Sequence, residues 1–176
     1  MFGFGKRKDS EVVEAVCVKI RPLFGILAHR LGGITPQLAN DPYVLGYVIG
    51  AATIFAQIET SGKATTELRG LVALSAIQAA FSSLSFTIQQ ASLAMQSVAG
   101  SSEAKRGSNA ADLIIGVGAG KTDRDSEPEI VAAKKAVAEM PESVKSMLGG
   151  NPRSLLLLEL QEQLFFLPIE AKYGTK

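Results

Sequence analysis

The sequence contains no tryptophan and a single cysteine, Cys17. One cysteine excludes an internal disulfide and a metal site built from several cysteines. Cys17 lies among valines in an apolar pattern, so we expect a small buried side chain at this position. Aromatic residues make up only 6% of the 176 residues. The core must therefore be built from aliphatic side chains, which favours helices.

Histidine is equally scarce, since His29 is the only one. A metal site with several histidines therefore cannot form, and no other residue can serve as the histidine of a Ser-His-Asp triad. His29 lies beside Arg30 near an expected helix end, where capping or exposure is commoner than catalysis. Glu159 and Glu162 have helical spacing but lack the neighbouring histidine of iron carboxylate proteins. We predict no cofactor and no metal, and we favour a protein without enzymatic activity.

A strong excess of charge is also missing, because 18 basic residues face 17 acidic ones. Nucleic-acid-binding proteins normally present a basic surface, so we predict no nucleic-acid partner. The basic cluster at 6–8 could contact anionic lipid, but residues 1–9 are predicted to form a mobile, solvated N-terminus. The acidic segment that follows is unlike the apolar core of a signal peptide, and cytoplasmic localisation is the expectation.

Proline and glycine mark the ends of the expected helices. Thr35-Pro36, Asp41-Pro42 and Asn151-Pro152 each pair an N-cap residue with proline at the first helical position. Between such signals, apolar residues recur every three or four positions, and no segment alternates with period two. The sequence therefore predicts an all-α protein, a helical bundle. Its helices are expected at 10–31, 42–60, 64–99, 129–139, 142–148 and 153–167.

The predicted helix at 64–99 is the most informative one, because residues from Gly70 to Ser102 carry no charge. Its apolar residues form a seam with the spacing of a coiled coil. A helix with one face in water normally carries charge there. We therefore expect a long central uncharged helix, and a homo-oligomer, with a dimer favoured, that is buried in part along it. The candidate interface residues are Leu74, Ile77, Phe81, Leu84, Ser85, Ile88, Ser92 and Met95.

Residues 42–58, PYVLGYVIGAATIFAQI, are the best candidate for membrane contact because they carry no charge. A span needs at least about 17 apolar residues. No basic residue lies close by to set the orientation of such a span. A buried core helix is therefore favoured over membrane contact. Gly46 and Gly50 then mark a tight crossing with a neighbouring helix, since glycines four residues apart let two backbones approach closely.

The stretch LIIGVGAGKT, residues 113–122, ends in Gly-Lys-Thr as a phosphate-binding loop does. Such a loop also needs a glycine five residues before Gly120, where this chain has Ile115. The acidic segment that follows would repel phosphate. Residues 100–128 are therefore predicted to form a flexible glycine-rich linker that does not bind nucleotide. A weak anion site at 116–122, and a hydrolase that uses these glycines, stay open as alternatives.

The last predicted helix lies in SLLLLELQEQLFFLPI, residues 154–169, and has a wider apolar face than a small protein usually covers alone. We expect residues 129–169 to pack on the helical core, 10–99, or on a partner subunit, and residues 170–176 to form a tail. The sequence favours a non-enzymatic helical interaction protein that self-associates. The alternative is a helical bundle that binds an apolar small molecule or a lipid, including at a membrane surface.

Overall fold

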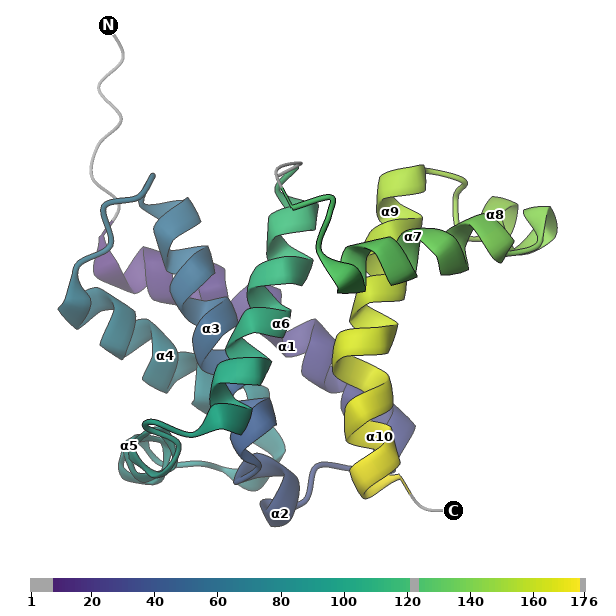
Figure 1. Cartoon of the computed structure of the whole chain (residues 1–176). Helices are drawn as coiled ribbons and strands as arrows, with labels where there is room; N and C mark the ends of the chain where they lie inside the picture. The colour runs from purple at the N-terminus through teal and green to yellow at the C-terminus, as the bar shows by residue number, and fades with distance from the viewer. Residues whose placement is uncertain (1–7, 121–123, 175–176) are drawn as a thin grey trace, which may run out of the picture. The chain divides into compact units, whose positions relative to one another are not determined.

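The structure is a computed structural model that describes residues 8–120 and 124–174 (Figure 1). Within these ranges the chain forms helices and no strand, so the predicted all-α fold is confirmed. The chain divides into two compact units, Met1–Ala111 and Asp112–Lys176. The boundary between the units falls inside one helix, α6 (Ser102–Gly118). In the described part of the chain, no helix is long and apolar enough to cross a membrane.

The first unit is built mainly from α1, α3 and α4, which pack against one another in all three pairs. Phe24 of α1 and Phe81, at the end of α4, meet edge to face with their ring centres 5.4 Å apart. Most of the other core residues are aliphatic, as the composition predicts. The helices of this unit are α1 (Asp9–Leu31), α2 (Pro36–Ala39), α3 (Pro42–Glu59), α4 (Thr66–Ala80), the 3-10 turn η1 (Ser82–Leu84), α5 (Ile88–Ser97) and the first part of α6.

Side-chain caps fix where these helices begin. The Thr35 hydroxyl accepts a hydrogen bond from the backbone N–H of Leu38 at 3.2 Å. The Asp41 carboxylate accepts one from the N–H of Val44 at 3.1 Å, and Thr65 caps α4 in the same way. Each cap satisfies a donor that the first helical turn leaves without a partner. These starts follow directly from the local sequence.

The structure corrects the prediction of one helix over 64–99. α4 ends at Ala80, and Ser85 has a left-handed backbone with φ of 52°, which interrupts the helix before α5 begins at Ile88. Thr87 and Gln90 form a capping box at 3.2 and 2.8 Å that starts α5. Serine and threonine hydroxyls compete with helical hydrogen bonds, which makes the segment between α4 and α5 a favourable place for a break.

The structure also corrects the predicted linker over 100–128, because residues 102–118 form α6. The Ser101 hydroxyl accepts a hydrogen bond from the N–H of Ala104 at 3.3 Å and so caps the start of this helix. The apolar residues Ala111, Leu113 and Ile114 are buried. The many glycines and serines of this stretch therefore do not indicate a linker.

Glycine in α6 serves close packing on α3 instead. A Cβ atom built on Gly46 would lie 2.0 Å from the carbonyl oxygen of Ala104, and one on Gly50 would lie 2.6 Å from Oγ of Ser108. From the other side, a Cβ on Gly107 would lie 2.0 Å from the carbonyl oxygen of Tyr43. No side chain fits at such distances, so the two backbones approach this closely only because all three residues are glycine.

The second unit contains the end of α6, α7 (Pro128–Glu139), α8 (Glu142–Met147), α9 (Pro152–Gln161), a π-helical turn η2 (Glu162–Phe166) and α10 (Leu167–Tyr173). α9 packs on α7. In η2 the N–H of Leu167 donates to the carbonyl of Glu162, five residues earlier. Pro168 has no N–H to donate, so the regular ladder of hydrogen bonds must change near it. Helical structure thus extends through η2 and α10 to Tyr173, past the end of the helix predicted at 153–167.

Candidate functional site

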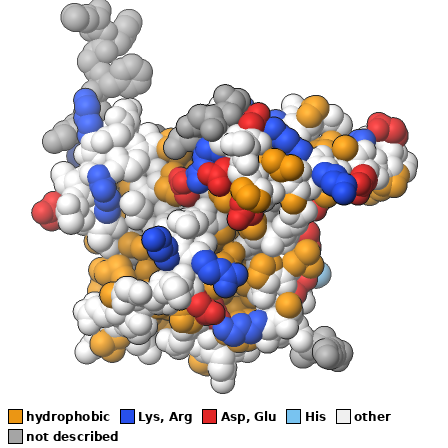
Figure 2. All heavy atoms as spheres, in the orientation of Figure 1, with side chains coloured by type: hydrophobic (Ala, Val, Ile, Leu, Met, Phe, Trp, Pro, Cys, Tyr) orange, Lys and Arg blue, Asp and Glu red, His pale blue; other side chains and the backbone are white. Residues whose placement is uncertain are grey.

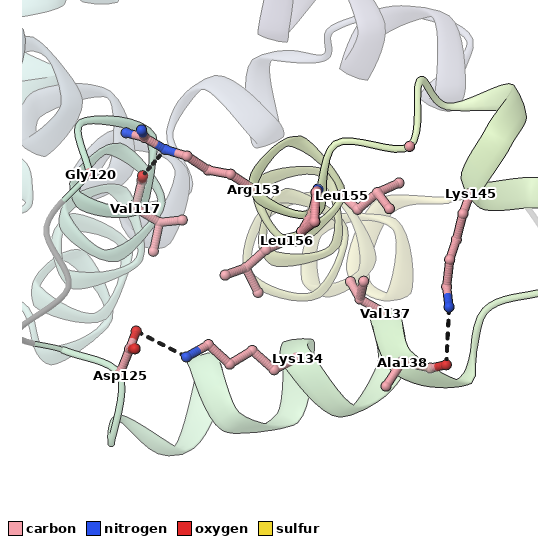
Figure 3. Close-up of a pocket in the computed structure, with 12 residues that line it drawn as sticks. Val117, Gly120, Asp125, Lys134, Val137, Ala138, Lys145, Arg153, Leu155 and Leu156 are labelled. Atoms are coloured by element: carbon pink, nitrogen blue, oxygen red, sulfur yellow. Dashed lines mark hydrogen bonds and ion pairs between the residues drawn. The ribbon is translucent and has the colours of Figure 1, made fainter. Parts of the chain in front are cut away.

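The second unit contains a pocket of about 620 Å³ (Figure 3). This volume lies within the range of about 300–1,000 Å³ that small-molecule sites occupy. Its walls are largely apolar, and the residues with charge lie among them. The lining residues are Val117, Gly120, Asp125, Lys134, Val137, Ala138, Lys145, Gly150, Pro152, Arg153, Leu155 and Leu156.

Two helices supply most of the pocket wall. On α7, Lys134, Val137 and Ala138 are three and four residues apart, which places them on one face of the helix. On α9, the Asn151 side chain accepts hydrogen bonds from the backbone N–H groups of Arg153 and Ser154 at 3.0 and 3.1 Å. This cap fixes the first turn of α9, from which Arg153 and the leucines of the pocket project.

Gly149 and Gly150 connect α8 to α9 with φ values of 89° and 65°. The N–H of Gly150 donates to the carbonyl of Lys145 at 2.8 Å and so ends α8. L-residues with a side chain rarely adopt such a backbone, whereas glycine adopts it readily. The pair of glycines thereby lets the chain turn directly from α8 into the helix that carries Arg153.

Arg153 reaches from α9 to the end of α6 (Figure 3). Its Nε donates to the carbonyl of Val117 at 3.1 Å, and its Nη2 donates to the carbonyl of Gly118. A cation is favourable at the carboxyl end of a helix, where carbonyl groups lack helical partners. Among the residues that the structure describes, no carboxylate pairs with this guanidinium.

The two lysines of the pocket do have acidic partners. Lys134 pairs with Asp125 at 3.0 Å. Lys145 pairs with Glu142 at 2.8 Å and also donates to the carbonyl of Ala138 at 3.3 Å. Among the described residues, the lining thus contains three basic residues and one acidic residue, Asp125. The pocket is an apolar hollow with positively charged groups among its walls.

Arg124 holds the segment that carries Asp125. Its guanidinium pairs with Asp112 of α6 and with Glu127 at 3.4 Å. Partial burial lowers the pKa of Arg124, but the hydrogen bond and the negative charge of Asp112, together with Glu127, outweigh burial and leave the pKa above its ordinary value. The guanidinium therefore stays charged, and its ion pairs anchor the chain between α6 and α7.

Few side chains of the kinds that act in catalysis line the described part of the pocket. The lining residues that the structure describes include no histidine, cysteine, serine or threonine that could act as a nucleophile or as a base near neutral pH. In the part of the chain that is described, no three side chains of His, Cys, Asp or Glu are grouped as metal ligands. What the pocket offers is apolar surface and fixed positive charge.

The glycine stretch at 116–122 lies next to this pocket but does not form a phosphate-binding loop in its described part. Gly116 is buried within α6, and Gly118 is the last residue of that helix. The helix therefore ends here, whereas a phosphate site uses the positively polarised start of a helix. Gly120 follows with φ of 82°. Lys121 and Thr122 lie outside the described residues.

The candidate interface residues are divided between the core and the surface. Ile77 and Phe81 are buried inside the first unit. Ser85 and Ile88 are exposed, while Leu74, Leu84, Ser92 and Met95 are partly exposed. Figure 2 shows hydrophobic side chains over α5, without acidic or basic ones. Gly46 and Gly50, the candidate tight crossing, lie against α6.

Comparison with known proteins adds no relative to this picture. No family model matches the sequence, and neither the curated proteins nor the solved structures gave a match. What the chain does must be argued from its own residues.

Proposed function

We propose that the protein is a helical binding protein that holds an apolar small molecule in the pocket between α7 and α9. The observation that carries this proposal is a pocket of about 620 Å³ with walls that include Val117, Val137, Leu155 and Leu156. Covering apolar surface contributes about 25 cal/mol per Å² removed from water. A ligand with a hydrocarbon body would gain most from such walls.

Filling the pocket tests the proposal. The probe is N-phenyl-1-naphthylamine, an uncharged compound that fluoresces in apolar surroundings. Val137→Trp places an indole in the pocket wall and is expected to weaken probe binding about tenfold, or roughly 1.4 kcal/mol. Val131→Trp is the matched control, because Val131 is on the same helix, is exposed and does not line the pocket. Its affinity for the probe is expected to stay at that of the unaltered protein.

Two results would contradict the pocket proposal. In the first, the unaltered protein shows no saturable fluorescence with the probe. In the second, the Val131 and Val137 variants weaken binding equally, so that the binding surface lies elsewhere.

A second function, self-association, is supported by the surface of α5. Ile88 and Leu93 expose 66% and 59% of their surface within a stretch that carries no charge. A surface without ions can lose its water without leaving a charge buried and unpaired, which would be expensive. A two-fold dimer is the commonest assembly that covers such a surface. We therefore propose a second copy of this chain as its partner.

Light scattering tests this second function. The unaltered protein is expected to have twice the mass of the 18.5 kDa chain. The double variant Ile88→Glu, Leu93→Glu places like charges on α5 and is expected to have the mass of one chain. Val131→Glu introduces the same charge at an exposed position of α7 and is expected to remain dimeric. A mass of 18.5 kDa for the unaltered protein at high micromolar concentration would rule the dimer out.

A further inference from the structure

We infer that the ligand of this pocket has one anionic head group on an apolar chain, as a long-chain carboxylate has, and that Arg153 binds the head. The inference rests on the proposed binding function and adds to it the chemical class of the ligand and the residue that selects it.

The charges around the pocket are not balanced. Lys134 is neutralised by Asp125, and Lys145 by Glu142, whose side chain is largely in solvent. Arg153 has only carbonyl groups as partners within the described residues. Among the described basic residues of the pocket, Arg153 is therefore the one without a carboxylate partner. A ligand with one negative charge would complete this arrangement.

Arg153 also keeps hydrogen-bond donors for a ligand. A guanidinium has five N–H donors in a planar fork. The contacts to Val117 and Gly118 use Nε and Nη2. Nη1 makes no hydrogen bond to the described part of the protein. Its N–H groups, with the second one of Nη2, match the two oxygens of a carboxylate, which arginine typically binds through two parallel hydrogen bonds.

Gly120 lies close to the charged end of Arg153. A Cβ atom at this position would lie 2.9 Å from Nη2 of Arg153 and 3.3 Å from Nη1. A side chain here would make the flexible end of Arg153 shift, and the φ of 82° is one that residues with a side chain rarely adopt. With glycine, the charged end of Arg153 meets no side chain at position 120 (Figure 3).

The remaining lining indicates what the rest of the ligand is. Its described residues include no aromatic one, so a nucleobase or another flat ring would find none of them to stack on. Leucine and valine walls favour a hydrocarbon chain instead. The side chains of Lys134 and Lys145 can lay their own methylene groups along that chain while their charged ends stay in water.

Calorimetry on the full-length protein with three dodecyl probes tests the inference. The probes are dodecanoate, 1-dodecanol and dodecyltrimethylammonium, each below the concentration at which it aggregates. Dodecanoate is expected to bind about tenfold more tightly than the alcohol, as a charge-assisted hydrogen bond predicts. The ammonium compound is expected to bind more weakly than the alcohol. Arg153→Gln should lower the affinity for dodecanoate to about that for the alcohol, which removes the preference for the acid.

Lys135→Gln is the matched control, since Lys135 is on α7 beside Lys134 but does not line the pocket. It removes the same charge from the protein and is expected to keep the preference for dodecanoate. Arg153 also caps α6, so thermal unfolding is recorded for each variant. NMR of the arginine Nε–H groups in the unaltered protein provides a second measurement, with Arg153→Lys to assign the signal. Dodecanoate, and not dodecanol, should shift the signal of Arg153.

The outcomes separate the inference from the function on which it rests. Equal affinity of the unaltered protein for all three probes would overturn the anionic ligand and leave the apolar pocket intact. Binding of none of them would overturn both. A preference for dodecanoate that survives Arg153→Gln, or an Arg153 signal that does not move when dodecanoate binds, would show that another residue holds the head group.

Discussion

Gly46→Ala is expected to destabilise the first unit by more than about 3 kcal/mol, beyond the usual range for overpacking a core. The new methyl group would lie 2.0 Å from the carbonyl oxygen of Ala104 and 2.5 Å from its Cα. These atoms belong to the backbone of α6, which cannot move aside as the end of a flexible side chain can. α3 and α6 would have to separate, and the contacts on both sides of the crossing would be lost.

The chain offers a matched control for this substitution. Gly70 lies inside α4, and a Cβ atom there would meet nothing within 4 Å. Gly70→Ala is therefore expected to stabilise the protein by about 0.5–1 kcal/mol, because alanine loses less backbone entropy than glycine when a helix forms. Urea unfolding followed by circular dichroism measures both variants. Similar stabilities for Gly46→Ala and Gly70→Ala would mean that the close crossing does not exist in solution.

Phe81→Ala is expected to lower the free energy of unfolding by about 3–5 kcal/mol, as is typical when a buried phenylalanine is truncated. The Phe81 side chain is fully buried. It lies against the ring of Phe24 at 5.4 Å and against that of Phe86 at 5.7 Å. The cavity left by its removal would lie where α1 and α4 meet, and the rings around it could fill that space only in part.

Ile88→Ala provides the comparison, because Phe81 and Ile88 occupy equivalent positions in the apolar seam of the sequence. In the single chain Ile88 is 66% exposed, and at concentrations too low for self-association its truncation is expected to change stability by less than about 0.5 kcal/mol. Denaturant unfolding of the two variants distinguishes two separate helices, α4 and α5, from one continuous helix. A large loss of stability for both would indicate one continuous helix, buried along its whole seam.

The parts of the fold that the sequence predicts correctly depend on local signals. Thr35, Asp41 and Asn151 cap helices because their side chains reach backbone groups two or three residues away, and no distant contact is needed. The break after α4 has a local signal as well, the pair Thr87 and Gln90. The apolar residues keep a regular spacing from α4 through α5. This spacing predicts one continuous helix and does not reveal the capping box that starts α5.

α6 shows why composition alone is an uncertain guide. Gly107 in a stretch with serines and charges is typical of a linker, yet its role is set by Tyr43, which is 64 positions earlier in the sequence and meets it across the helix crossing. The pocket also depends on contacts between residues that are far apart in the sequence. Lys134 and Val137 share a helix face that a sequence can indicate, but Arg153 joins them only because α9 packs back on α7. No local pattern contains that information.

The π-helical turn η2 affects how relatives of this protein can be found. A turn of this kind is an α-helix that has gained one residue, so the side chains after Phe166 are rotated relative to those before Glu162. A related protein with a regular helix here would be one residue shorter between Leu160 and Ile169. An alignment without a gap would then match buried positions to exposed ones over α10. Allowing a single-residue gap at 162–166 keeps the apolar faces in register.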